Sequence, residues 1–198
     1  ATRNEILKSL KAETARVFVE DVDRKNVALL RFRMNDYGKR VKLIAELHEA
    51  MREKCAGKSL VFVATKKQGE KVKDFLDEAG VDCQFFHGSL DAMEREAIIQ
   101  RFSTSNPDDS GSGLECLICT NAFGMGMDIP NIRLVFHWHH SASVEDYTQE
   151  FGRAGRDGRQ SLAVVFSSDD DRKLLNFMAK KSVENSKLPE AARSTALD

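Results

Sequence analysis

Short apolar runs alternate with amphipathic stretches along this chain, and that alternation restricts the fold more than any other feature. Apolar runs bounded by turn residues are typical of buried strands, whereas apolar residues spaced three and four apart indicate helices. The pattern predicts strands at Val27–Phe32, Ser59–Ala64, Cys83–Phe86, Leu114–Cys119, Ile132–His137 and Leu162–Phe166. It predicts helices at Arg40–Arg52, Gln68–Ala79, Asp91–Phe102 and Asp169–Ala179, and from Ser143 toward Phe151. The fold class is therefore α/β, in three layers around a mostly parallel sheet.

Helix ends carry local signals of their own. Asp91 with Glu94, and Ser143 with Asp146, have the spacing of capping boxes. Gly57-Lys58-Ser59 resembles the end of a phosphate-binding P-loop, but Arg52 stands where that loop needs its first glycine, and the strand follows the turn instead of preceding it. We interpret Gly57 as a helix stop.

Length and charge exclude several classes of protein. The 198 residues fit one domain with flanking segments. Because no apolar stretch approaches the ~20 residues of a membrane-spanning helix, we expect a soluble protein with no membrane partner. The net charge of -1 means that any nucleic-acid binding must depend on local basic clusters. Ser103–Gly113 is predicted to be a surface loop without chemistry.

The four cysteines, Cys55, Cys83, Cys116 and Cys119, lie in segments predicted to be buried, which favours a reducing compartment. Cys116 and Cys119 have the C-x-x-C spacing of metal and redox sites. On a strand, however, residues three apart point to opposite faces, so we interpret both as core residues.

Gln149 to Gly158 forms a compact turn in which Arg153 and Arg156 are separated by small residues. Guanidinium groups stay charged and match phosphate oxygens, and the glycines allow close approach, so the turn is suited to reading a polyphosphate. The alternative is a solvated basic turn whose arginines pair with Glu150 and Asp157.

The segment Thr120–Pro130 directly follows a predicted strand, and therefore lies at the ligand-binding edge of a parallel sheet. Gly124 and Gly126 allow a ligand to approach the backbone, and Asp128 can accept hydrogen bonds from sugar hydroxyls. The alternative is a plain glycine-containing turn with Met125 and Met127 in the core.

Together these segments resemble the second motor lobe of superfamily 2 helicases, and specifically the RecQ family. The motifs are Leu60-Val-Phe-Val-Ala-Thr65, Phe86-His-Gly-Ser-Leu90, Phe123-Gly-Met-Gly-Met-Asp-Ile-Pro-Asn-Ile-Arg133, His137, Ser143-Val-Glu-Asp-Tyr147 and Gln149-Glu-Phe-Gly-Arg-Ala-Gly-Arg-Asp-Gly158. DEAD-box RNA helicases usually have a histidine-arginine pair where this chain has Gln149-Glu150, which favours a DNA motor. Phe151 and Ser141 depart from the residues usual in RecQ relatives.

The resemblance implies a RecA-like (P-loop NTPase-type) helicase C-terminal domain at 22–180, preceded by the end of the first lobe or a linker at 1–21 and followed by a polar linker or tail at 181–198. Arg156 would be the arginine finger on the γ-phosphate, Arg153 would couple that site to neighbouring motifs, and Gln149 would orient the network. The nucleotide would lie near Gly124, Gly126 and Asp128. Thr120, Asn121 and Gly124 would relay between nucleotide and DNA strand.

We expect the DNA backbone to bind at Thr65 and at the turn His87-Gly88-Ser89, which offer amides, hydroxyls and a helix amino terminus. Lys66, Lys67 and Arg95 add positive charge nearby, although such residues are often simply solvated. His137, His139 and His140 invite a zinc interpretation, but the end of a strand explains them better.

The resemblance further implies a 3′ to 5′ DNA helicase of replication, recombination or repair, with ATP and Mg²⁺ held mainly by the first lobe and zinc only in a possible downstream subdomain. Its partners would be single-stranded and duplex DNA and the first lobe. We expect the chain alone to hydrolyse no ATP, and the parent to act in the nucleus if eukaryotic, otherwise in the cytoplasm or nucleoid. The alternatives are a docking module from a degenerate helicase and a lobe of an RNA helicase.

Overall fold

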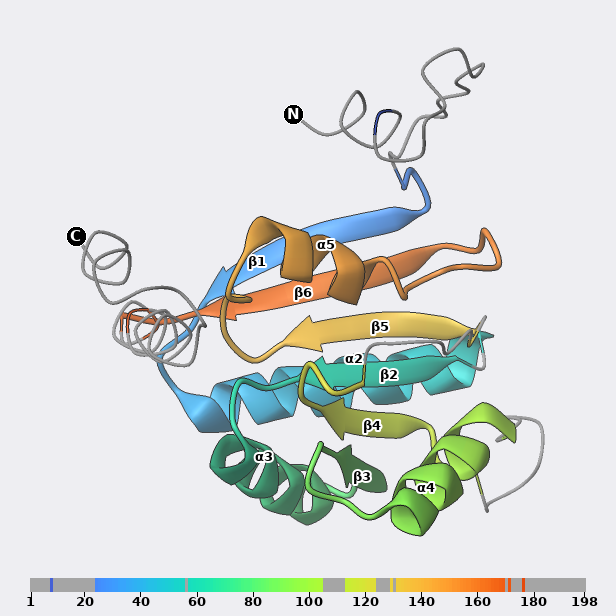
Figure 1. Ribbon diagram of the computed structural model, residues 1–198. Coiled ribbons are helices and arrows are strands. Elements are labelled where there is room, and N and C mark those ends of the chain that lie inside the picture. The colour runs from blue at the N-terminus through green and yellow to red at the C-terminus, as the bar shows by residue number, and fades with distance from the viewer. Residues whose placement is uncertain are drawn as a thin grey trace.

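Six parallel strands form one sheet at the centre of the molecule (Figure 1). The computed structural model describes residues 8, 24–55, 57–104, 113–123, 129, 131–169, 171 and 176. The strands are β1 (Val27–Arg33), β2 (Lys58–Phe62), β3 (Cys83–Phe86), β4 (Cys116–Cys119), β5 (Ile132–His137) and β6 (Ser161–Ser167), in the spatial order β1-β6-β5-β2-β4-β3. The predicted parallel sheet is confirmed, and each strand lies within two residues of its predicted bounds.

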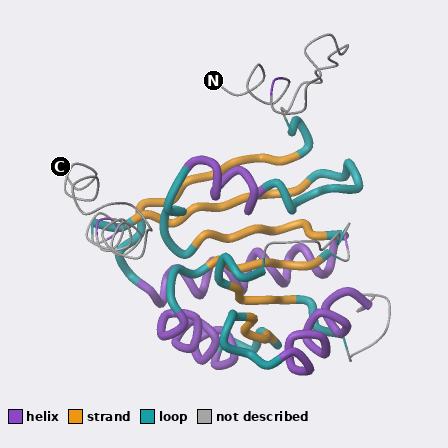
Figure 2. The backbone as a smooth tube through the Cα atoms, viewed as in Figure 1, coloured by secondary structure: helices purple, strands orange, loops and turns teal. Residues whose placement is uncertain are grey.

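Helices cover both faces of the sheet, which gives the predicted three layers (Figure 2). The helices are α2 (Tyr37–Cys55), α3 (Lys66–Glu78), α4 (Ala92–Thr104) and α5 (Val144–Phe151). Residues of α2 and α3 pack on one core with Val61 and Phe136, whereas residues of α4 and α5 pack on a second core with Leu60 and Val135. Because neighbouring strand residues enter different cores, both faces of the central strands β2, β4 and β5 are buried, whereas most residues of the edge strand β1 are exposed.

The predicted helix caps are present. The Asp91 carboxylate accepts from the Glu94 amide at 2.7 Å, and the Asp91 amide donates to the Glu94 carboxylate at 3.0 Å. Ser143 caps α5 by accepting from the Asp146 amide at 3.0 Å, and its hydroxyl donates to the Asp146 carboxylate. These bonds satisfy amides at the helix starts that have no partner within the helix.

The predicted burial of the cysteines is confirmed for Cys116 and Cys119 but not for Cys55. Cys116 lies in the core beneath α2 and α3 and Cys119 in the opposite core, as strand geometry predicts. Burial raises the pKa of Cys116 to about 12, so this thiol stays protonated. The prediction that Cys55 is buried is wrong, because Cys55 is exposed as the last residue of α2, one turn beyond the last buried residue, Met51.

Several predictions concern residues outside the described part of the chain. They include the segments 1–21 and 181–198, most of the predicted closing helix, most of the loop 103–113, and Gly124, Gly126 and Asp128. These stay predictions. Among the helices that the structure describes, none combines the length and the apolar character that crossing a membrane requires.

Candidate functional site: an arginine turn and the carboxyl edge of the sheet

The two arginines predicted to read phosphate lie in residues 152–159, here named the arginine turn, which follows α5 directly. The Gly155 amide donates to the Ile132 carbonyl at 2.8 Å, and the Gly158 amide donates to the Gly155 carbonyl at 3.0 Å. Because Ile132 begins β5, the turn lies at the amino ends of the strands. The prediction that the site lies at the carboxyl ends of the strands therefore does not hold for the arginine turn.

Gly155 is the residue that the packing of the turn requires most strictly. Its φ of +57° is in the left-handed region, which side chains strongly disfavour. A Cβ atom there would lie 2.5 Å from Asn26 Nδ2, 2.6 Å from Ser161 Oγ and 2.7 Å from the Arg159 carbonyl oxygen. Only glycine lets the turn pack this closely on the entries of β1 and β6.

An ion pair anchors the far side of the turn to β5. The Arg133 guanidinium donates hydrogen bonds to both carboxylate oxygens of Asp157, with 3.0 Å between Nη1 and Oδ1. The Arg133 side chain is only 4% exposed. Hydrogen bonding from Arg133 lowers the pKa of Asp157 below its ordinary value. If the turn were simply solvated, Asp157 was expected to pair with Arg153 or Arg156. The Asp157 carboxylate instead pairs with Arg133 of β5.

The two arginines of the turn have different surroundings. Arg153 is buried, and its guanidinium carbon lies 5.8 Å from the centre of the Phe123 ring. Burial lowers the pKa of Arg153, and the nearby charge of Arg156 lowers it further. Arg156 and Gln149 are exposed. The turn thus presents one cation at the surface and keeps a second beneath it.

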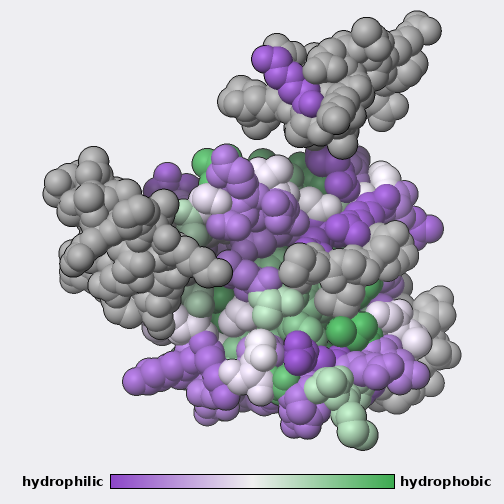
Figure 3. All heavy atoms as spheres, in the orientation of Figure 1, coloured by the Kyte–Doolittle hydropathy of each residue, from purple (hydrophilic) through white to green (hydrophobic). Residues whose placement is uncertain are grey.

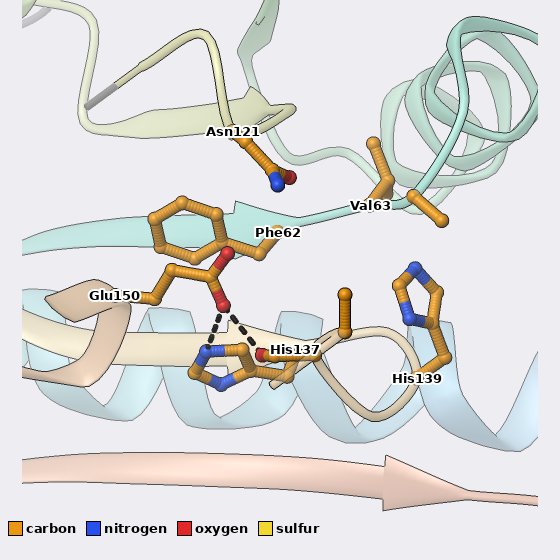
Figure 4. A pocket seen from close by; sticks show the side chains of 9 residues that line it. Phe62, Val63, Asn121, His137, His139 and Glu150 are labelled. Carbon is orange, nitrogen blue, oxygen red and sulfur yellow. Dashed lines mark hydrogen bonds and ion pairs between the residues drawn. The ribbon is translucent and has the colours of Figure 1, made fainter. Parts of the chain in front are cut away.

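A small pocket at the carboxyl ends of β2 and β5 brings α5 to the segment after β4 (Figure 4). The Glu150 carboxylate lies 3.0 Å from His137 Nε2 and accepts from the Ser141 hydroxyl at 2.5 Å. Asn121 points into the same pocket. Because Glu150 belongs to α5, this cluster gives α5 a polar contact with the carboxyl edge of the sheet. Glu150 also directly follows Gln149, which was predicted to be catalytic.

Two histidines of this region, His137 and His139, are buried and make contacts within the protein. His137 ends β5, as predicted, and stacks on Phe62 with ring centres 5.4 Å apart. His139 contacts the His140 carbonyl oxygen through Nδ1 at 2.7 Å, and burial lowers the pKa of His139. Within the described ranges, no group of three or more histidine, cysteine or acidic side chains could hold a metal ion.

The residues predicted to contact DNA share one edge of the sheet. Thr65 follows β2, Thr120 and Asn121 follow β4, and the turn from His87 follows β3, in three neighbouring strands. The Thr120 amide donates to the Phe86 carbonyl at 3.3 Å, which ties the ends of β4 and β3 together. This juxtaposition agrees with the prediction for a parallel sheet, whose carboxyl ends form the ligand-binding edge.

Some donors predicted for DNA are already engaged. The Ser89 amide donates to His87 Nδ1 at 3.2 Å, and the Asp91 and Glu94 amides are used in the capping box. Thr65 accepts from the Gln68 amide at 3.2 Å as the N-cap of α3. Burial, followed by the charge of Lys66, lowers the pKa of His87. Because Nδ1 accepts from the Ser89 amide, a neutral His87 ring carries its hydrogen on Nε2.

Sequence reasoning assigned no role to two residues that hold the arginine turn. Arg24 and Asn26, which precede β1, donate hydrogen bonds to backbone carbonyls of the turn. The sequence shows an arginine and an asparagine just before a predicted strand. The neighbouring residues, however, do not indicate which turn these two side chains contact.

The surface above the sheet is mixed in character. Hydrophilic residues predominate over α5, and hydrophobic residues lie between α5 and α4 on the face shown in Figure 3. Part of the apolar surface comes from Met93 in α4, which is 81% exposed.

Comparison with known protein families gives one match that covers most of the chain. Residues 39–158 match the family described as helicase conserved C-terminal domain. The matched range includes the carboxyl-edge residues and the arginine turn through Gly158, but not Arg24 or Asn26.

Several curated proteins are similar to the chain. It is 30% identical over 87% of its length to the probable ATP-dependent DNA helicase RecS of Bacillus subtilis, covering 33% of that protein. It is 29% identical over 86% of its length to the ATP-dependent DNA helicase RecQ of Pasteurella multocida, covering 25% of it. A pre-mRNA-splicing ATP-dependent RNA helicase of Cryptococcus neoformans also matches, at 30% identity over 69% of the chain and 18% of that protein. The chain thus spans a third or less of these relatives.

Solved structures share the fold. The Escherichia coli DEAD-box protein SrmB, in complex with the regulator of ribonuclease activity A, superposes with a TM-score of 0.63 over 80% of this chain and 86% of its own, at 23% identity. This similarity agrees with the RecA-like fold that the motifs predict.

Proposed function

We propose, since this chain belongs to the helicase conserved C-terminal domain family, that it is the second motor lobe of an ATP-dependent RecQ-type DNA helicase. The parent would move 3′ to 5′ on single-stranded DNA and unwind duplexes during replication, recombination or repair. It would work in the nucleus of a eukaryote, or in the cytoplasm or nucleoid of a bacterium.

One observation carries the proposal: a rigidly packed turn presents Arg156 at the surface with Arg153 buried beneath it. A cation held in a fixed place can stabilise the charge that develops on a transferring phosphoryl group at little reorganisation cost. ATP and Mg²⁺ would be held mainly by the other lobe. Gln149 would orient the network, and Gly124, Gly126 and Asp128 would line the nucleotide.

The carboxyl edge would contact the backbone of the DNA strand. Thr65, Thr120 and Asn121 lie there with His87, Gly88 and Ser89. Backbone contacts carry no sequence information, so binding should be independent of sequence. The cluster of Glu150, His137 and Asn121 would connect this edge to α5. Gln149-Glu150 favours DNA over RNA as the substrate. A binding competition between single-stranded DNA and single-stranded RNA for the parent protein distinguishes the two.

Kinetics of the intact helicase test the arginine finger. Arg156→Ala should lower the kcat of DNA-stimulated ATP hydrolysis by about 10³-fold or more, while affinity for single-stranded DNA stays within about twofold. Arg156→Lys should recover only a small part, because lysine lacks the planar fork of donors. Arg159→Ala is the matched control, since it removes a neighbouring exposed arginine. Near-normal hydrolysis by Arg156→Ala would refute the assignment.

The isolated chain provides a second test. The 198-residue chain should show no ATP turnover above a no-enzyme blank, because the phosphate-binding loop belongs to another lobe. Robust turnover would contradict the division of labour. If the gene that encodes the chain has no upstream G-x-x-x-x-G-K-[ST] motif, the docking-module alternative is favoured instead.

A further inference from the structure

We infer that Arg24 and Asn26 are positioning residues, which hold the arginine turn in the geometry that presents Arg156. The inference rests on the proposed function of Arg156, and it assigns a role to a segment that precedes the matched helicase region. Neither residue need touch nucleotide or DNA, because both act on the backbone of the turn.

Arg24 makes the larger contribution to this contact. Its Nη1 donates to the Gly152 carbonyl at 3.2 Å, and its Nη2 donates to the carbonyls of Ala154 and Gly155 at 2.7 and 2.9 Å. These carbonyls flank Arg153 on both sides along the chain. The Arg24 guanidinium therefore fixes the backbone that directly precedes Arg156.

Asn26 holds the other end of the turn. Its Nδ2 donates to the Gly155 carbonyl at 2.8 Å and to the Arg159 carbonyl at 2.9 Å, and these two residues bracket Arg156. The Asn26 carbonyl accepts from the Ser161 amide at 2.8 Å, so the same residue also joins β1 to β6. The backbone on both sides of Arg156 is thus tied to the entry of β1.

Charge explains why an arginine suits this position. Gly152 is the C-cap of α5, so the carbonyls there carry the negative end of the helix dipole. The Arg24 guanidinium offsets that charge and satisfies carbonyls that have no partner in the helix. A lysine at this position has the charge, but its single ammonium cannot match the fork that contacts Gly152 and Ala154 together.

A double-mutant cycle in the intact helicase tests the inference. Arg24→Ala, Arg156→Ala and the double variant are compared with the parent, and kcat and KM for ATP, DNA affinity and melting temperature are measured. Lys25→Ala is the matched control, because Lys25 is an exposed cation between the two positioning residues. Asn26→Ala is measured beside them as an independent change on the second contact.

Arg24→Ala should lower kcat by about tenfold to a hundredfold with KM and DNA affinity within about twofold, because displacing a catalytic group costs chemistry more than binding. In the Arg156→Ala background, Arg24→Ala should cause little further loss. Asn26→Ala should follow the same pattern with a smaller loss, and Lys25→Ala should behave like the parent.

An equal fold-loss from Arg24→Ala in both backgrounds would overturn the inference, as would a change in melting temperature with kcat unaltered. If Arg24→Ala does not fold, the cycle is run with Arg24→Lys, which keeps the charge and the aliphatic stem. Failure of Arg156→Ala itself to lower kcat would refute the proposed function instead, so the two failures are distinguishable.

Discussion

The arginine turn and the carboxyl edge lie at opposite ends of the strands, and they are held in different ways. The turn is fixed by residues distant in sequence: Arg24 and Asn26 before β1, and Arg133 in β5. The edge residues Thr65, His87 and Ser89 make mainly local contacts, to residues two or three positions away. Long-range packing suits a group that must be preorganised, whereas local turns suit a surface that adapts to a mobile strand.

Replacement of Gly155 by alanine is the strongest way to break this contrast. Because a Cβ atom would lie within 2.7 Å of Asn26, Ser161 and Arg159 at a φ of +57°, Gly155→Ala should destabilise the protein by about 3 kcal/mol or more. Urea denaturation measures the change. Gly158→Ala is the matched control, since its φ of +80° is strained but no atom lies within 4 Å, and it should cost only about 1 kcal/mol. Equal losses would show that the packing of the turn is unimportant.

The ion pair of the turn should give the next largest effect. Asp157→Asn leaves the buried Arg133 guanidinium without its carboxylate, and should cost about 2 kcal/mol near neutral pH. Salt should change this cost little, because Arg133 is shielded from solvent.

The same pair predicts a pH dependence with a definite sign. The pKa of Asp157 is lower in the folded protein than its ordinary value, so its contribution is fully present above about pH 4. The contribution is lost as the pH falls through the folded value. The stability gap between the parent and Asp157→Asn should therefore narrow below about pH 4, and a gap that stays constant down to pH 2 would contradict the ion pair.

At the carboxyl edge, loss of the α3 cap should have a moderate effect. Thr65→Ala removes the hydroxyl that accepts from the Gln68 amide, and should cost about 1 kcal/mol. Thr65→Ser keeps the hydroxyl and should restore most of that stability. Binding of single-stranded DNA, measured by fluorescence anisotropy, should weaken severalfold with alanine and stay near the parent level with serine.

The smallest effect on stability is expected at Gly88. A Cβ atom there would meet only Ala122, at 3.8 Å, so Gly88→Ala should change stability by less than about 0.5 kcal/mol. If the His87 turn approaches phosphates closely, the same change should still weaken DNA binding severalfold. A loss of stability as large as that of Gly155→Ala would remove the contrast between the two regions.

Hydrophobic periodicity predicted the elements of this fold because each strand and helix is encoded locally. β3 and β5 have the bounds that the sequence predicted, and Asp91 and Ser143 cap helices as expected. Cys55 was wrongly predicted as buried, because the last buried residue of α2 is Met51, one turn before the helix ends at Cys55.

The contacts that hold the arginine turn could not be predicted in the same way. Arg24 and the Gly152 carbonyl are 128 positions apart, and their contact depends on the pairing of β1 with β6, the last strand in the sequence. The Arg133 to Asp157 pair likewise depends on the path of α5 back over the sheet. The roles of Gly124, Gly126 and Asp128 stay predictions, because these residues lie outside the described ranges.

A structure of the intact helicase with a nonhydrolysable ATP analogue and Mg²⁺ tests the central claim most directly. The account predicts that the Arg156 guanidinium lies about 3 Å from oxygens of the terminal phosphate, with Arg24 still bonded to the carbonyls of the turn. An Arg156 side chain directed into solvent, far from a triphosphate bound between the lobes, would contradict it.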